Sequence, residues 1–130
     1  MNPSTIFLAE GQQYVRDALH LMFDHQPGFT VIGETDCGQA LLTAVDGLCP
    51  EIILLDWFLP ALNPTEALRT LRNQCPHALI FATSVRPELA GYIQQFDIDG
   101  FLSKQLSPDE FIDQLKELIE KKEENQIKEK

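Results

Sequence analysis

The stretch that decides the fold reads E-I-I-L-L-D-W-F-L-P and runs from Glu51 to Pro60. Its unbroken apolar residues, 52–55, are typical of a strand that is buried on both faces of a parallel sheet. Pro50 and Pro60 leave too little length between them for a helix. Asp56 therefore lies where a central strand ends, and open α/β sheets bind their ligands at that edge. A helix N-cap or loop aspartate is the alternative interpretation of Asp56.

The length and composition of the chain limit its possible fold and function. The chain has 130 residues, 44% of them hydrophobic, which suits one domain with one core. Its 20 acidic and 10 basic residues give a formal charge of −10, which argues against nucleic-acid binding by this domain because phosphate contacts need clustered Lys and Arg. Cys37, Cys49 and Cys75 form no C-x-x-C pair and are predicted to be small apolar residues in a reducing compartment. No segment has the length or character of a membrane span or a signal peptide, so we expect a cytoplasmic protein without a membrane partner.

Hydrophobic patterning predicts strands that alternate with amphipathic helices. The further strands are expected at residues 5–9, 29–33, 78–83 and 100–103. The helices are expected at residues 13–24, 36–48, 63–75, 87–96 and 107–119. Three helix starts carry capping signals, namely Asp36 with Gln39, Asn63 with Pro64 and Glu66, and Ser107 with Pro108 and Glu110. This alternation predicts an α/β fold, a doubly wound five-stranded parallel sheet with helices on both faces. We expect one domain over residues 1–121 and a charged tail or linker over residues 122–130.

Polar residues stand where three of the predicted strands end. Asp56 ends the third strand, Thr83 the fourth and Lys104 follows the fifth, while Glu10 follows the first. If these strands are neighbours, the four side chains converge on one edge of the sheet. A carboxylate nucleophile, a hydroxyl, an ammonium group and a second acid suit phosphoryl transfer through an acyl phosphate.

This arrangement resembles the receiver domain of two-component response regulators, especially those of the nitrate-response and quorum-response type. The resemblance covers Thr5 to about Glu120 and rests on several motifs in the family's order. They are Glu10-Gly11 at the acidic pair, Arg16 on the first helix, P-E-I-I-L-L-D-W-F-L-P at the phosphoacceptor strand, Thr83 at the switch hydroxyl, and D-I-D-G-F-L-S-K before Gln105. The resemblance implies the flavodoxin-like receiver fold, with strand order 2-1-3-4-5.

The resemblance also implies roles for individual residues. Asp56 would be the phosphoacceptor, Thr83 and Lys104 the catalytic and switch residues, and Phe101 the aromatic switch. Mg²⁺ would be held by Asp56, Glu10 and the backbone carbonyl of Phe58. Such a domain is a signalling module and not an enzyme, beyond autocatalytic phosphoryl transfer to Asp56 and hydrolysis from it.

The implied partners are proteins. A histidine kinase or phosphotransfer protein would phosphorylate the domain. The face made by the fourth helix, fifth strand and fifth helix would then contact a downstream protein, a fused output domain or a second copy of the chain.

One departure from the family pattern bears on the chemistry. The second acid of the pair is Gly11, so we expect weakened Mg²⁺ binding, and we expect Gly11→Asp to tighten it. A pseudo-receiver that acts by protein contact without phosphorylation is therefore the main alternative. A phosphohydrolase of the haloacid dehalogenase type is a third interpretation, disfavoured because Phe58 stands where that family has a second aspartate.

Overall fold

The computed structural model describes residues 3–128 and contains one sheet whose neighbouring strands all run parallel. The strands are β1 (Ser4–Ala9), β2 (Phe29–Thr35), β3 (Ile52–Asp56), β4 (Leu79–Ser84) and β5 (Gly100–Ser103). Their order across the sheet is β2-β1-β3-β4-β5, which confirms the predicted fold class and strand order. β3 is the central strand, and every one of its residues is buried.

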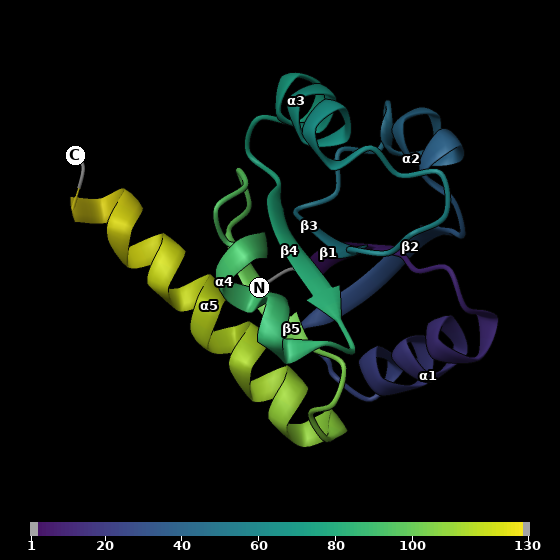
Figure 1. Ribbon diagram of the computed structural model, residues 1–130. Coiled ribbons are helices and arrows are strands. Elements are labelled where there is room, and N and C mark those ends of the chain that lie inside the picture. The colour runs from purple at the N-terminus through teal and green to yellow at the C-terminus, as the bar shows by residue number, and fades with distance from the viewer. Residues whose placement is uncertain (1–2, 129–130) are drawn as a thin grey trace.

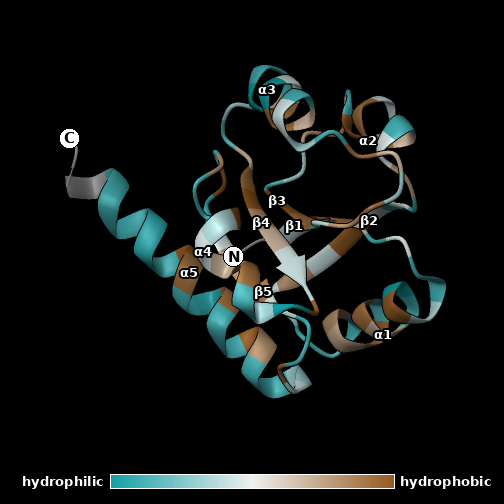
Figure 2. Cartoon of the chain, viewed as in Figure 1, coloured by the Kyte–Doolittle hydropathy of each residue, from teal (hydrophilic) through white to brown (hydrophobic). Residues whose placement is uncertain are grey.

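Helices cover both faces of the sheet (Figure 1). One face carries α1 (Gln13–Asp24) and α5 (Pro108–Lys128). The other carries α2 (Gly38–Val45), α3 (Pro64–Gln74) and the short α4 (Ala90–Ile93), which follows the 3₁₀ turn η1 (Pro87–Leu89). Figure 2 shows apolar residues concentrated in the strands, whereas the last turns of α5 are mostly hydrophilic. The hydrophobic core is therefore divided by the sheet into two halves.

Alternate residues of β3 enter these two half-cores. Ile52 and Leu54 belong to the half-core that α1 and α5 close, whereas Ile53 and Leu55 belong to the half-core under α2, α3 and α4. Successive side chains of a strand point to opposite faces, so a continuous apolar run is needed when both faces are covered. This arrangement explains why the run 52–55 contains no polar residue before Asp56.

Two of the three predicted helix caps are present. At the start of α3 the Asn63 side chain accepts a hydrogen bond from the Glu66 N–H at 3.3 Å. At the start of α5 the Ser107 hydroxyl accepts one from the Glu110 N–H at 3.3 Å, and the Glu110 carboxylate accepts one from the Ser107 N–H at 3.1 Å. These bonds satisfy backbone donors that have no partner within the first turn of a helix.

The predicted cap at Asp36 is wrong. β2 continues to Thr35, two residues beyond its predicted end, and α2 begins at Gly38 with no side-chain cap. The Gly38 N–H instead donates to the Pro60 carbonyl at 2.7 Å, which satisfies it without Asp36. A side chain at Gly38 would collide with the backbone at Ala61, since a Cβ there would lie 2.4 Å from the Ala61 oxygen.

Two predicted helices are shorter than their patterns suggested. α2 ends at Val45, and the left-handed Gly47 (φ 87°) turns the chain away, so Leu48 lies outside the helix and is exposed. The segment predicted as one helix over 87–96 divides into η1 and the four-residue α4. Gly91 lies inside α4, and glycine lowers helix stability.

The prediction that Cys49 and Cys75 are unpaired is wrong. The two form a disulfide whose Cα atoms are 5.3 Å apart, a normal separation for such a bridge. Cys37 is a free cysteine, as predicted. The sequence spacing of 26 residues gave no sign of the pair, because the contact arises from the parallel alignment of β3 with β4.

The charged tail begins as helix. α5 continues to Lys128, and Lys122 forms an ion pair with Asp99 at 3.0 Å, so part of the segment assigned to the tail packs against the domain. The last two residues lie outside the described part of the chain. The domain boundary at residue 121 stays a prediction.

Asp99 also joins β4 to α3. Its carboxylate accepts hydrogen bonds from the Ile80 N–H at 2.8 Å and from Arg72 at 3.0 Å. Partial burial of Asp99 opposes ionisation, but the bond from Ile80, the bond from Lys122 and the charge of Arg72 outweigh it and hold the pKa below its ordinary value of 3.8. This cluster fixes the loop that leads into β5.

We predict that Asp99→Asn lowers the free energy of unfolding at pH 7 by about 1–3 kcal/mol, because charged hydrogen-bond partners are lost. The pKa of folded Asp99 lies below the unfolded value, so its stabilisation is present above that value and is lost as the pH falls through the folded pKa. Urea denaturation should therefore show the difference shrinking below about pH 4. Asp97→Asn is the control, since that side chain is 77% exposed. Equal losses of unfolding free energy in the two variants at pH 7 would contradict the stabilising role of the Asp99 carboxylate.

Candidate functional site

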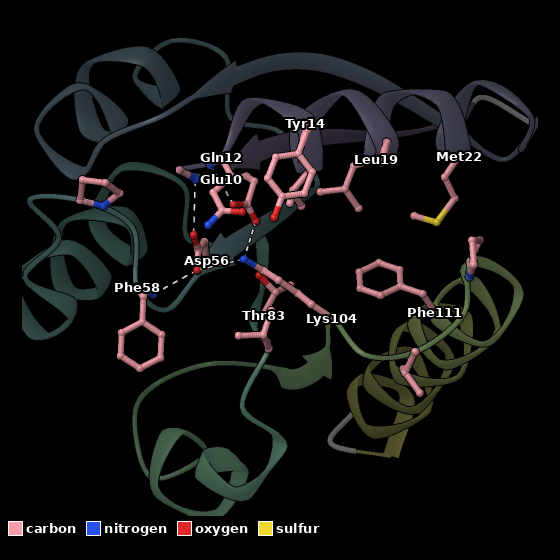
Figure 3. A pocket seen from close by; sticks show the side chains of 17 residues that line it. Glu10, Gln12, Tyr14, Leu19, Met22, Asp56, Phe58, Thr83, Lys104 and Phe111 are labelled. Carbon is pink, nitrogen blue, oxygen red and sulfur yellow. Dashed lines mark hydrogen bonds and ion pairs between the residues drawn. The ribbon is translucent and has the colours of Figure 1, made fainter.

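The carboxyl ends of β3, β4 and β5 bring the predicted residues together. Asp56 lies opposite Thr83 in the register of β3 with β4, and both are buried. The Lys104 N–H donates to the Ser84 carbonyl at 2.8 Å, which fixes Lys104 just beyond β5. Figure 3 shows Glu10, Asp56, Thr83 and Lys104 around one point. The predicted convergence of these four side chains is therefore found in the structure.

The centre of the site is an ammonium group between two carboxylates. Lys104 Nζ lies 3.1 Å from Asp56 Oδ1 and also pairs with Glu10 Oε1. Glu10 is 2% and Asp56 6% exposed, so both negative charges are largely removed from water. A buried charge needs a partner of opposite sign and further hydrogen bonds. Lys104 supplies the first requirement for both acids.

Backbone amides supply the second requirement. Asp56 Oδ1 accepts from the Phe58 N–H at 3.1 Å, and Oδ2 accepts from the Gly11 N–H at 3.3 Å. Glu10 Oε2 accepts from the Gln12 N–H at 3.0 Å. The alternative role of Asp56 as a helix N-cap is wrong, because Asn63 caps the helix that follows.

Arg16 and the end of β2 hold the backbone of Glu10 in place. The Arg16 guanidinium donates to the Glu10 carbonyl at 2.7 Å and pairs with Glu34 at 3.0 Å. The Glu10 N–H donates to the Thr35 carbonyl at 3.1 Å. The sequence showed Arg16 through the family resemblance, but the support from the end of β2 became visible only in the structure.

Aromatic residues connect the site to the face that holds α4. Trp57, the only tryptophan, is buried and makes an edge-to-face contact with Phe96, with ring centroids 4.8 Å apart. Phe96 makes a similar contact with the exposed Tyr92 at 5.4 Å. Phe101 on β5 is partly buried against the same half-core. The switch role of Phe101 stays a prediction.

Gln105, the residue after the D-I-D-G-F-L-S-K motif, contacts the neighbouring loop. Its side-chain amide donates to the Val85 carbonyl at 2.8 Å. The bond ties the loop after β5 to the loop after β4, two residues beyond Thr83.

Gly11 is enclosed by the loop that follows β3. A Cβ built at this position would lie 2.8 Å from Cδ of Pro60 and 3.6 Å from Asp56 Oδ2. A contact under 3.0 Å with a rigid proline ring requires the backbone to move. The sequence predicts that Gly11→Asp adds a ligand, but in this structure the added side chain meets Pro60 first.

A cavity of about 560 Å³ opens beside the charged residues. Its apolar wall comes from α1 and from α5 with its preceding loop, and includes Val15, Leu19, Met22, Leu106 and Phe111 (Figure 3). Asp56, Thr83 and Lys104 line its polar end. The carboxylate of Asp56 can therefore be reached from outside the protein although it is mostly buried.

Comparison with known proteins agrees with this geometry. The family described as response regulator receiver domain matches residues 6–116. This chain belongs to that family. Among curated proteins, the receiver is similar to the nitrate/nitrite response regulator protein NarL of Escherichia coli K12, with 28% identity over 112 residues, 85% of this chain and 52% of NarL. It is also similar to the response regulator UvrY of the same strain, with 24% identity over 82% of this chain and 50% of UvrY. The chain thus spans about half the length of these relatives.

Solved structures show the same fold. A two-component response regulator of the LuxR family from Aurantimonas sp. SI85-9A1 aligns with a TM-score of 0.78 and 20% identity, over 89% of this chain and 84% of that one. The receiver domain of the putative regulator NarL from Mycobacterium tuberculosis aligns with a TM-score of 0.78 and 18% identity, over 90% of this chain and 96% of that one. At this identity the likeness concerns the fold alone.

The oxygen ligands available to a metal ion in this receiver are few. Glu10 and Asp56 converge on the same ammonium group, and the Phe58 carbonyl follows two residues after Asp56. Within residues 3–128 no group of three or more His, Cys, Asp or Glu side chains is placed to hold a metal ion. Mg²⁺ is usually held by one or two carboxylates with waters and phosphate oxygens. The donor set therefore fits a weakly held Mg²⁺. Over the same residues, no helix combines the length and apolar character needed to cross a membrane.

We predict that Lys104→Met lowers the free energy of unfolding by about 2–4 kcal/mol, because two buried carboxylates lose their counter-charge. Lys104→Met with Asp56→Asn should recover part of this loss, since one of the two charges is gone. Urea denaturation at pH 7 measures both effects. Lys116→Met, on the exposed side of α5, is the matched control. No recovery in the double variant would mean that Lys104 stabilises the fold by packing and not by charge.

We predict that Gly11→Asp alone destabilises the receiver by about 1–3 kcal/mol, because residue 11 then overlaps Pro60. Gly11→Asp combined with Pro60→Ala should fold well and bind Mg²⁺ about tenfold tighter than the wild type. The fluorescence of Trp57, next to Asp56, follows the titration. Pro60→Ala alone is the control and should leave Mg²⁺ affinity unchanged. A stable Gly11→Asp single variant with tight binding would show that the loop yields easily.

Proposed function

We propose that this receiver accepts a phosphoryl group on Asp56 from a phosphorylated histidine of a partner protein and thereby passes on a two-component signal. The observation that carries the proposal is the contact of Lys104 Nζ with Asp56 Oδ1 at 3.1 Å, at the polar end of an open cavity. A carboxylate oxygen would attack phosphorus, the bond from phosphorus to the histidine nitrogen would break, and an acyl phosphate would form. The partner regains a neutral imidazole.

The residues around Asp56 have distinct parts in this step. Lys104 offsets negative charge on the transferred group, and the amides of Gly11 and Phe58 orient the carboxylate. The Thr83 hydroxyl, across the register from Asp56, can donate to a phosphoryl oxygen after transfer. Glu10, Asp56 and the Phe58 carbonyl would hold Mg²⁺, which when bound adds positive charge at the transferred group. Because Gly11 contributes no carboxylate, we expect a slow reaction.

The signal would leave through the surface of α4, β5 and α5. A phosphoryl group on Asp56 that forms hydrogen bonds with Thr83 and Lys104 would favour one arrangement of the loops after β4 and β5. The hydrogen bond from Gln105 to Val85 already joins these two loops. Tyr92 is 58% exposed on this surface and is available to a partner protein, an output domain or a second receiver. The matched part of this chain spans only about half of each relative, so an output domain in a longer protein fits the proposal.

A pseudo-receiver is the second candidate function, favoured by the closure of Pro60 over Gly11. In this alternative Lys104 permanently balances Asp56 and Glu10, and the surface of α4, β5 and α5 binds its partner without phosphorylation. The two functions differ in one measurable step, the modification of Asp56.

We predict that acetyl phosphate with Mg²⁺ adds one phosphoryl group to the wild type slowly, as intact-mass spectrometry would show, and that alkali removes it. Asp56→Asn should abolish the addition. Asp36→Asn, which changes an exposed acid elsewhere on the chain, should not. The variant with Gly11→Asp and Pro60→Ala should react faster. If that variant is modified and the wild type is not, the pseudo-receiver is the correct reading; modification of Asp56→Asn would mean that another residue is the acceptor.

A further inference from the structure

The Cys49–Cys75 disulfide lies at the edge of the sheet opposite the phosphoryl site. Cys49 stands shortly before β3, and Cys75 stands between the end of α3 and the start of β4. Asp56 and Thr83 lie at the other ends of the same two strands. The bridge therefore closes a loop that contains the whole of β3, the loop after it and α3. Asp56, Phe58 and Pro60 all lie within this loop.

The two bridged cysteines differ in their exposure to solvent. Cys49 is exposed and lies in the turn after α2, with a left-handed backbone (φ 40°) that is uncommon for a residue other than glycine. Cys75 is 3% exposed, packs in the half-core under α2, α3 and α4, and donates its N–H to the Leu71 carbonyl at 2.8 Å. Thiol–disulfide exchange requires that a thiolate reach one sulfur of the bridge. Of the two residues, Cys49 is the one exposed to a dissolved thiol.

We propose that Cys49 and Cys75 form a reversible thiol-modification site, in which Cys49 exchanges with small thiols such as glutathione and Cys75 is the resolving partner. This proposal concerns the stability of the segment around Asp56 and is independent of whether Asp56 is phosphorylated.

The exchange is balanced in two steps. A glutathione thiolate attacks Cys49 Sγ, the bridge breaks, and Cys75 leaves as a thiolate that takes a proton from water. A second glutathione thiolate attacks the glutathione sulfur of the mixed disulfide and releases Cys49 as a thiolate, which also takes a proton. One protein disulfide and two thiols thus become a protein dithiol and glutathione disulfide. The reverse sequence closes the bridge and is driven by glutathione disulfide as oxidant.

Closing the bridge should raise thermal stability. A disulfide that spans 26 residues restricts the unfolded chain, and the oxidised receiver should melt about 10 °C above the reduced one. Since the bridged loop contains Asp56, amide hydrogen exchange in β3 and α3 should slow more on oxidation than exchange in α1.

The test equilibrates the full chain, without denaturant, in buffers of different glutathione to glutathione disulfide ratio, followed by acid quenching, alkylation and peptide mapping. We expect alkylation of Cys37 alone in oxidising buffers and of all three cysteines in reducing buffers, reversibly, with the change in melting temperature following the same ratio. In the reduced wild type Cys49 should alkylate at least about tenfold faster than Cys75.

Variants separate the pair from the third cysteine. Cys37→Ser should keep both the bridge and the melting shift, whereas Cys49→Ser should lose both. Three outcomes would overturn the proposal: a pair that stays reduced in glutathione disulfide, a bridge that glutathione opens only after unfolding, or equal alkylation rates for Cys49 and Cys75. The rate comparison uses the wild type, so it stands even where a variant folds poorly.

Discussion

The arrangement of the site, at the carboxyl ends of the strands, depends on the ion pairs of Lys104 with two buried carboxylates. Lys104 follows β5, Asp56 ends β3, and Glu10 follows β1. In the sheet, β4 lies between β3 and β5. The contact can form only if the strand order places all these carboxyl ends side by side. Its net contribution to stability is limited by the cost of removing the three charges from water, so its main effect is to fix geometry.

That geometry accounts for the other features of the site. Two carboxylates facing one ammonium group leave excess negative charge, and backbone amides of Gly11, Gln12 and Phe58 are directed at it. The Gly11 amide can approach Asp56 because residue 11 has no side chain to separate the backbone from Pro60. A glycine here therefore leaves this position without a carboxylate and at the same time admits a closer loop. The absence of a carboxylate at residue 11 and the position of Pro60 therefore belong to one local structure.

Much of this arrangement could be predicted from the sequence, since it depends on strand ends. Asp56, Thr83 and Lys104 follow apolar runs whose lengths determine where each strand stops, and the parallel fold brings such ends together. Errors occurred where tertiary contacts compete with local signals. Asp36 has the residue type of a helix cap, but pairing with β1 carries β2 as far as Thr35 and leaves Asp36 outside the helix start. The overlap of Gly11 with Pro60 has no sequence signal, because it depends on the path of a loop.

The contact between Cys49 and Cys75 can be deduced from the strand order, but not from the spacing of the cysteines in the sequence. With β3 beside β4, Ile52 pairs with Leu79, and the residues shortly before each strand must also be close. Cys49 and Cys75 occupy those places, so their contact follows from the strand order once that order is known. The segment that carries Asp56 is consequently held at both ends of the sheet, by Lys104 at the carboxyl edge and by the disulfide at the amino edge. The first link responds to charge and the second to thiols, so two independent chemical conditions bear on the same strand.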